Sequence, residues 1–352
     1  MNKSSYLIWF RRLALAGAVL AFVVIVLGAW VRLSAAGLGC PDWPGCYGHL
    51  TAEDAARNVD AINAAFPERP FEYHKAVKEM VHRYFASTLG FVILLLAGLA
   101  IANRDDPEQP VALPSALVGL VIFQGLLGMW TVTLLLKPLI VVLHLLGGLT
   151  TFALLAWLAM KSGESRDSGF ATRDSGKHAG SRVQLPDSSF RSLRTLALAG
   201  LVILVLQIGL GGWTSSNYAA LACPDFPTCQ NAWWPEMDAA DAFVLWRGLG
   251  IDYEGGVLDH PARVAIHFAH RLGAIAAALI LGALSIAAWR ARERPGVRMA
   301  GALLAIVLLA QLVLGPLMVM RALPLTLATA HNGVAALLLF ATVRLNRVLR
   351  WS

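Results

Sequence analysis

The sequence predicts an all-α polytopic membrane protein, with eight transmembrane helices in two repeat-related four-helix bundles and both termini in the cytoplasm. Three observations predict this fold. The chain is 57% hydrophobic with a mean hydropathy of +0.61, above the apolar share that is typical of soluble domains. Eight stretches reach or approach the roughly 20 apolar residues that span a bilayer core. An internal repeat relates the first half of the chain to the second.

The eight stretches differ in their polar content. Five of them hold no charged residue: 13–31, 84–102, 111–136, 195–213 and 299–320. The others are 138–160 and 322–343, with one histidine each, and 272–289. The first stretch is long enough to span and no convincing cleavage site of small residues follows it, so we interpret it as a helix and not as a signal peptide.

Lysines and arginines predict the orientation. An even number of helices places both termini on the same side of the membrane. Of the 29 lysines and arginines, 18 lie in the termini and connections on that side. Because positive residues collect in cytoplasmic connections, we expect cytoplasmic termini and a location in a bacterial plasma (inner) membrane. The net charge of +7 then reflects the orientation of the chain in the membrane. The basic residues are spread over five segments, which argues against a nucleic-acid surface.

The repeat divides the chain into domains. The segment Cys40-Pro-Asp-Trp-Pro-Gly-Cys46 returns 183 residues later as Cys223-Pro-Asp-Phe-Pro-Thr-Cys229. Gly28-x-Trp30 returns at the same offset as Gly211-x-Trp213, and Gln124 matches Gln311 at an offset of 187. We interpret the helix glycines as packing positions. The predicted domains are an N-terminal bundle, a Ser-, Gly- and Arg-rich cytoplasmic linker and a C-terminal bundle: 1–160, 161–194 and 195–352.

All four cysteines fall in two long connections, 32–81 and 214–263, which we expect on the periplasmic side. Disulfides persist outside the plasma membrane. Four cysteines allow three pairings, and each connection holds its own two, so we expect Cys40–Cys46 and Cys223–Cys229. A thiol–disulfide protein is the weaker interpretation, because the Cys-x-x-Cys spacing that depresses a thiol pKa is missing. Whether the pairs are catalytic or structural stays open.

Four histidines recur at matching intervals, with His82 and His144 62 residues apart and His270 and His331 61 apart. Histidine in a membrane span is a functional candidate by default. Haem iron takes axial imidazoles, and facing histidines in a bundle core can hold the macrocycle. We therefore predict one haem site in each half. All four histidines would lie in the outer half of the bilayer, which suits reaction between a cofactor and a substrate better than electron relay across the membrane.

One position breaks the symmetry. Glu79 precedes His82 by three residues, on the same helical face, and its mate at an offset of 188 is His267. A carboxylate beside an iron ligand can move protons or stabilise a cationic intermediate, which suggests chemistry in the first half and a resident cofactor in the second. Arg83 and Arg271 are candidates to hold haem propionates, with interfacial snorkelling as the alternative.

These motifs resemble the haem A synthase family, in its cysteine-containing bacterial form. The resemblance covers essentially the whole chain except 161–194, and it rests on the Cys-x5-Cys pairs and four short segments: Glu79-Met-Val-His82-Arg83, His144-Leu-Leu-Gly-Gly, His270-Arg271-Leu-Gly and His331-Asn-Gly. It implies an oxidoreductase that oxidises the C8 methyl of haem O to a formyl group, giving haem A for terminal oxidases. Two successive hydroxylations and loss of water from a geminal diol would form the aldehyde.

The resemblance also implies roles for the site residues. His270 and His331 would ligate a resident haem b, His82 and His144 would hold the substrate haem, and Glu79 falls on the family's catalytic glutamate. The implied partners are a haem O synthase (protohaem farnesyltransferase), oxidase assembly factors and an electron-transfer partner that the sequence does not identify. The oxygen source, the electron acceptor and assembly as a homo-oligomer stay open.

Two other classes share the dihaem plan. A b-type, quinol-linked electron carrier would need no Glu79 and should have a quinone pocket. A haem-binding chaperone or transporter would bind haem without converting it. Haem O and haem A beside haem b in pigment extracted from the protein would distinguish the synthase from both.

Overall fold

The computed structural model describes residues 3–161, 187–292 and 294–351. Within these ranges, eight helices are long and apolar enough to cross a membrane, which confirms the all-helical membrane fold. They are α1 (Lys3–Leu33), α4 (Tyr73–Ala102), α5 (Ala112–Thr133), α6 (Pro138–Lys161), α7 (Asp187–Ser216), α9 (His260–Arg290), α10 (Pro295–Met320) and α11 (Leu325–Trp351).

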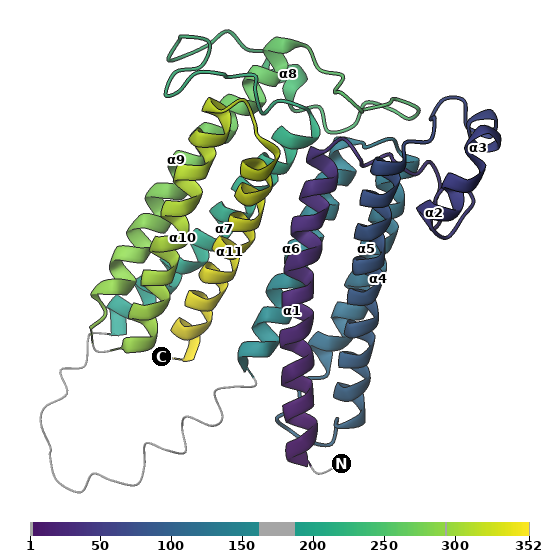
Figure 1. Ribbon diagram of the computed structural model, residues 1–352. Helices are drawn as coiled ribbons and strands as arrows, with labels where there is room; N and C mark the ends of the chain where they lie inside the picture. The colour runs from purple at the N-terminus through teal and green to yellow at the C-terminus, as the bar shows by residue number, and fades with distance from the viewer. Residues whose placement is uncertain (1–2, 162–186, 293, 352) are drawn as a thin grey trace, which may run out of the picture.

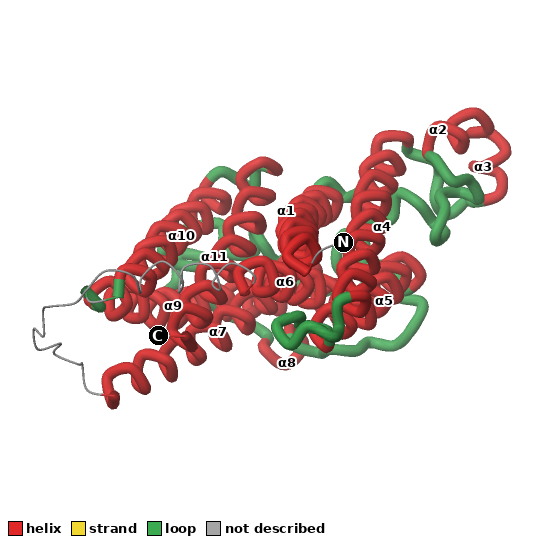
Figure 2. The backbone as a smooth tube through the Cα atoms, turned by 90° about the horizontal axis from the view of Figure 1, so that it is seen from below, coloured by secondary structure: helices red, strands yellow, loops and turns green. Residues whose placement is uncertain are grey.

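The long helices form two groups of four that lie side by side (Figures 1 and 2). In the first group, α1, α4, α5 and α6 form a closed ring in which each helix packs against two neighbours, and α7, α9, α10 and α11 form a second ring. Contacts of α1 and α6 with α11, and of α6 with α7, join the rings. A single apolar core runs through both, with Ile93, Leu155, Leu281 and Leu304 fully buried.

The helices keep apolar side chains on both their inner and outer faces. On α7, Leu198, Val202 and Leu206 recur every four residues and are about 60% exposed. A row of exposed apolar side chains of this kind is favourable where it faces lipid. The helix also pairs its own backbone groups, as a lipid environment requires. Small residues bring helices together on the inside: a methyl group at Gly301 would lie 2.7 Å from Cβ of Ala288.

Several helices begin earlier than the hydropathy of the sequence indicates. α4 begins at Tyr73 and α9 at His260, so their first turns hold charged residues that the connections 32–81 and 214–263 were expected to contain. α7 begins at Asp187, inside the expected linker, and residues 162–186 of that linker lie outside the described residues. α1 begins and α11 ends at the end of the molecule opposite the outer connections (Figure 1).

The two outer connections, 34–72 and 217–259, cover the other end of the helices. The first contains the short helices α2 (Ala52–Ala55), η1 (Ala56–Asn58) and α3 (Val59–Ala65), and the second contains α8 (Ala239–Ala242). Each has a small apolar core of its own. In the first, the ring of Tyr47 packs edge-on against Phe66 and Phe71, with 5.3 Å between centroids in both pairs.

Part of the second connection crosses to the first half, and we call residues 243–258 the strap. The main-chain N–H of Tyr253 in the strap donates to the carbonyl oxygen of Leu135 over 3.1 Å. Lys137 is buried at the α5–α6 turn, donates to the carbonyl of Gly248 and lies 3.7 Å from the centroid of the Trp246 ring. Burial lowers the pKa of the Lys137 amine. The strap therefore ties the outer ends of the two halves together.

Candidate functional site

Each outer connection begins with a small loop closed by a disulfide. Cys40 is bonded to Cys46 and Cys223 to Cys229, which confirms the predicted pairing. In each loop, an aspartate carboxylate accepts hydrogen bonds from the main chain of the loop. The carboxylate of Asp42 accepts main-chain N–H groups from Tyr47 and Gly48, at 2.6 and 2.7 Å. The motif therefore needs aspartate two residues after the first cysteine, because a carboxylate satisfies two loop donors at once.

The second loop makes the same contacts. The carboxylate of Asp225 accepts the main-chain N–H groups of Gln230 and Asn231, at 2.7 and 3.0 Å, and the hydroxyl of Thr228. Hydrogen bonding from Thr228 and the main chain holds the pKa of Asp225 below its ordinary value of 3.8. The two loops are thus matched in contacts as well as in sequence.

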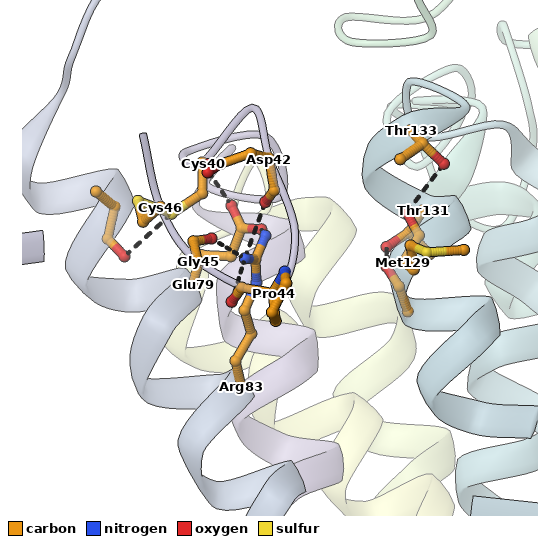
Figure 3. Close-up of polar contacts among 12 residues, drawn as sticks. Cys40, Asp42, Pro44, Gly45, Cys46, Glu79, Arg83, Met129, Thr131 and Thr133 are labelled. Carbon is orange, nitrogen blue, oxygen red and sulfur yellow. Dashed lines mark hydrogen bonds and ion pairs between the residues drawn. A yellow bond between two sulfur atoms is a disulfide. The ribbon is translucent and has the colours of Figure 1, made fainter. Parts of the chain in front are cut away.

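Glu79 and Arg83 lie beneath the first loop (Figure 3). The Nη1 of Arg83 donates to the carbonyl oxygens of Asp42 and Pro44, at 3.0 and 3.2 Å. Its Nη2 forms an ion pair with Oε1 of Glu79. The other carboxylate oxygen accepts the main-chain N–H of Cys40 over 2.9 Å, and Glu79 is only 5% exposed. The carboxylate is therefore fixed to the disulfide loop and paired with a neighbouring cation.

The second loop has His267 where the first has Glu79. Nδ1 of His267 lies 3.3 Å from the main-chain N–H of Cys223, and Nε2 lies 3.3 Å from Nε of Arg271; the neutral ring accepts one of these two hydrogen bonds, because its other nitrogen carries a proton. Arg271 also donates to the carbonyls of Cys223, Asp225 and Thr228, at 2.7 to 2.8 Å. A neutral imidazole thus lies where the first half has a carboxylate. Arg83 and Arg271, which we expected at haem propionates, are both hydrogen-bonded to the disulfide loops.

The structure places the four candidate haem ligands in two pairs, one in each ring of helices. His82 on α4 and His144 on α6 belong to the first ring, and His270 on α9 and His331 on α11 belong to the second. All four lie six to ten residues after the first residue of their helices. This places the two pairs at the same end of the molecule, below the disulfide loops.

Each of these histidines packs against a glycine of the neighbouring helix. A methyl group on the glycine would lie within 3.5 Å of the imidazole in every case, at distances of 2.8, 3.5, 3.1 and 3.5 Å for the following pairs: Gly28 with His82, Gly128 with His144, Gly211 with His270, and Gly315 with His331. The glycines expected as general packing positions therefore set the space around the rings.

These surroundings fit a haem with two imidazole ligands in each half. Among the described residues, none is hydrogen-bonded to the buried ring Nδ1 atoms of His144 and His331, which leaves these nitrogens available to a ligand. Within the described ranges, no three His, Cys, Asp or Glu side chains gather to hold a metal ion by themselves. A pair of imidazoles matches the axial needs of haem iron.

Two glutamines contact the second pair, and sequence reasoning missed them. Nε2 of Gln207 on α7 lies 3.0 Å from Nδ1 of His270, and Nε2 of Gln311 on α10 lies 3.1 Å from Nε2 of His331. The available signal was the match of Gln124 with Gln311 in the repeat. That match indicates only the repeat, because glutamine in an apolar helix has no single chemical meaning.

Comparison with known proteins gives the family. A protein named heme A synthase from Shewanella oneidensis is 42% identical over 97% of this chain and 96% of its own length. Heme A synthases from Caulobacter vibrioides and Symbiobacterium thermophilum are 28% and 25% identical, over 95% and 92% of this chain and 94% and 90% of their own lengths. Residues 11–343 match the family described as cytochrome oxidase assembly protein. The chain therefore belongs to the COX15-CtaA family of cytochrome oxidase assembly proteins.

Proposed function

We propose that this protein is a haem A synthase, a membrane oxidoreductase that converts the C8 methyl of haem O to a formyl group. The name shared by its relatives supports the reaction, and oxidase assembly is the context that the family description gives. The observation that carries the proposal is a difference between the two halves. The two disulfide loops are alike, but the side chains beneath them are different. A buried carboxylate, Glu79, serves the first half, and an imidazole, His267, serves the second.

The two haem sites have different roles in this proposal. His82 and His144 bind haem O as substrate, and His270 and His331 bind haem b as the resident cofactor. Haem b, when bound there, supplies a reversible one-electron carrier. The glycine beside each histidine and the buried ring Nδ1 atoms of His144 and His331 support this use of the four rings. A haem O synthase is the proposed supplier of substrate.

Glu79 is the proposed catalytic residue. Oxidation of the methyl releases protons, and positive charge on the methyl carbon has to be stabilised, so a fixed carboxylate one turn from His82 is useful in both respects. Arg83 and the N–H of Cys40 hold both oxygens, which fixes the orientation of the group. Arg83 and Arg271 are the proposed propionate partners, in which case each guanidinium would join a propionate to its disulfide loop.

We further propose that the two halves are structural repeats, with the disulfide loops in the periplasm and the segment 161–194 in the cytoplasm. Matched loop contacts at an offset of 183 support the repeat. So do the α5–α6 and α10–α11 turns, where Leu135 and Leu136 in one, and Ala322 and Leu323 in the other, adopt positive φ. A reporter fused after Ser352 should be active only in the cytoplasm, and activity only in the periplasm contradicts this topology.

Glu79→Gln tests the catalytic assignment. It keeps the shape of the side chain and the acceptor for Cys40, but removes the charge. The variant should keep haem b and bind haem O, yet form no haem A. Glu72→Gln is the matched control, because Glu72 is exposed and forms a salt bridge with Lys75 at the start of α4; it should form haem A normally. Wild-type haem A from Glu79→Gln removes Glu79 from the mechanism. Pigment with haem b alone, rapidly reduced by a quinol, would instead indicate an electron carrier.

A further inference from the structure

A groove runs along the junction of the two halves, between α6, α7 and α11 (Figure 2). Its volume is about 290 Å³. Along α6 it extends from Leu146 to Trp157, a length of about 16 Å at the rise of an α-helix. The hydrocarbon core of one leaflet is ~15 Å thick, which is half of the bilayer core. The groove is therefore about as long as one leaflet is thick.

The walls of the groove suit hydrocarbon. Among the described residues that line it, only Thr150 and Asn346 carry a hydroxyl or an amide. The Thr150 hydroxyl donates to the carbonyl oxygen of Leu146 over 2.8 Å, and the Asn346 amide donates to that of Ala197 over 3.0 Å. Both polar groups are thus engaged by the main chain. Val205 on the wall is 39% exposed, so the groove is open to the surroundings of the helices.

Three arginines gather at the Trp157 end of the groove. The guanidinium groups of Arg347 and Arg350 lie 5.1 and 5.9 Å from the centroid of the Trp157 ring. Nη1 of Arg347 also donates to the carbonyl oxygen of Trp157 over 3.1 Å. From α7, Nε of Arg194 donates to the carbonyl oxygen of Leu349 over 2.7 Å. Arg347 is buried and fixes Trp157, whereas Arg194 and Arg350 are exposed and can bind a ligand.

The apolar walls and the positive end match two parts of one ligand. An anionic phospholipid has an acyl chain for the walls and a phosphate for the arginines, since guanidinium binds phosphate through paired N–H groups. A free phosphate lacks the chain, and a quinone lacks the charge. The arginines lie at the end of the molecule opposite the disulfide loops (Figure 1), where anionic lipids are bound by basic pockets between helices if that end is cytoplasmic.

We propose that this groove binds an anionic phospholipid of the cytoplasmic leaflet. One acyl chain lies against α6, α7 and α11, and the phosphate lies at Arg194 and Arg350. The bound chain fills the space between the two halves and so adds to their contact. The choice of leaflet rests on the proposed topology, and the site itself is independent of the proposed reaction.

The test is native mass spectrometry of the purified full-length protein in detergent, titrated with phosphatidylglycerol or with phosphatidylcholine. The wild type should bind phosphatidylglycerol more tightly. Arg350→Gln should lower that affinity about fivefold, as expected for the loss of one basic residue at an anionic lipid. Arg350→Lys keeps the charge and should stay near the wild type. Ala153→Phe narrows the groove without a change of charge and should also weaken binding.

Arg298→Gln is the matched control. The guanidinium of Arg298 on α10 lies 5.6 Å from the centroid of the Trp289 ring on α9, so it forms a similar pair away from the helices of the groove. Its loss should leave the affinity for phosphatidylglycerol unchanged.

Equal affinity of the wild type for the two lipids overturns the proposal. So does an equal loss of affinity in Arg298→Gln and Arg350→Gln, which indicates attraction by general positive charge. Wild-type affinity in Ala153→Phe shows that no chain occupies the groove, and if that variant does not fold, wild-type affinity in Arg350→Gln rejects the site. Haem A formation plays no part in these measurements, so failure of the proposed reaction leaves the lipid result standing.

Discussion

Replacing Gly28 with alanine should impair the conversion of haem O while haem b stays bound. The new methyl carbon would lie 2.8 Å from Nε2 of His82, and ordinary contact begins at 3.4 Å, so the ring has to move by about 0.6 Å. Overpacking of this kind costs ~1–3 kcal/mol, which corresponds to a loss of about 5- to 150-fold in substrate binding. The helix itself should tolerate the change, because alanine is the better helix former.

The matched substitution in the second half is Gly211→Ala. Its methyl group would lie 3.1 Å from Cε1 of His270, so that ring has to move by only about 0.3 Å. We expect a weaker effect, at the lower end of the same range, and on haem b instead of haem A. Gly98→Ala is the control on α4, because a methyl group there meets nothing within 4 Å.

The assay is chromatography of haems extracted from membranes in which each variant is made together with a source of haem O. Gly28→Ala should show haem b at the wild-type level and a reduced ratio of haem A to haem O. Gly211→Ala should lose haem b first, and Gly98→Ala should match the wild type. Equal pigment profiles from Gly28→Ala and Gly211→Ala, or normal haem A from Gly28→Ala, would refute the assignment of the two rings to different haems.

Three further predictions concern the second half and the strap. His331→Ala should remove the low-spin bis-imidazole spectrum of haem b from a protein that still folds, and an intact spectrum would reject this ligand. Lys137→Met keeps the apolar stem but loses the amine that donates to Gly248, so limited proteolysis should cut the strap faster than in the wild type; equal rates would deny its role as an anchor. Because the folded-state pKa of Asp225 is lowered, its stabilisation of the second loop is complete above pH 3.8 and is lost as the pH falls through the folded-state value. A phosphine reductant should therefore open Cys223–Cys229 faster in acid, and Asp225→Asn should be fast already at pH 7; identical rates for variant and wild type at pH 7 would contradict this.

The sequence predicted those parts of the fold that depend on short-range or repeated patterns. Each cysteine had one partner within its own loop, so Cys40–Cys46 and Cys223–Cys229 were the simplest bridges. The eight apolar stretches lie in eight long helices of the described chain, because a continuous apolar stretch of about 20 residues crosses the bilayer as a helix that pairs its own backbone groups. The histidine pairs followed from equal intervals in two halves.

Contacts between distant segments could not be predicted. Hydropathy started the second apolar stretch at residue 84 because Glu79 and Arg83 are charged, yet Glu79 is buried and Arg83 half-buried beneath a loop some 40 residues earlier. Lys137 was indistinguishable from a solvated turn residue, because its carbonyl partner is 111 positions away. In each case the burial of a charge depends on a partner that only the folded chain supplies.

The most direct test of the central claim is the pigment that the full-length protein forms from haem O. In cells that make haem O but have no other route to haem A, wild-type protein should yield haem A beside haem b, and Glu79→Gln should yield haem O beside haem b. Haem A in both would show that Glu79 is dispensable. Haem O without haem A in membranes that contain folded wild-type protein loaded with haem b would contradict the proposed function.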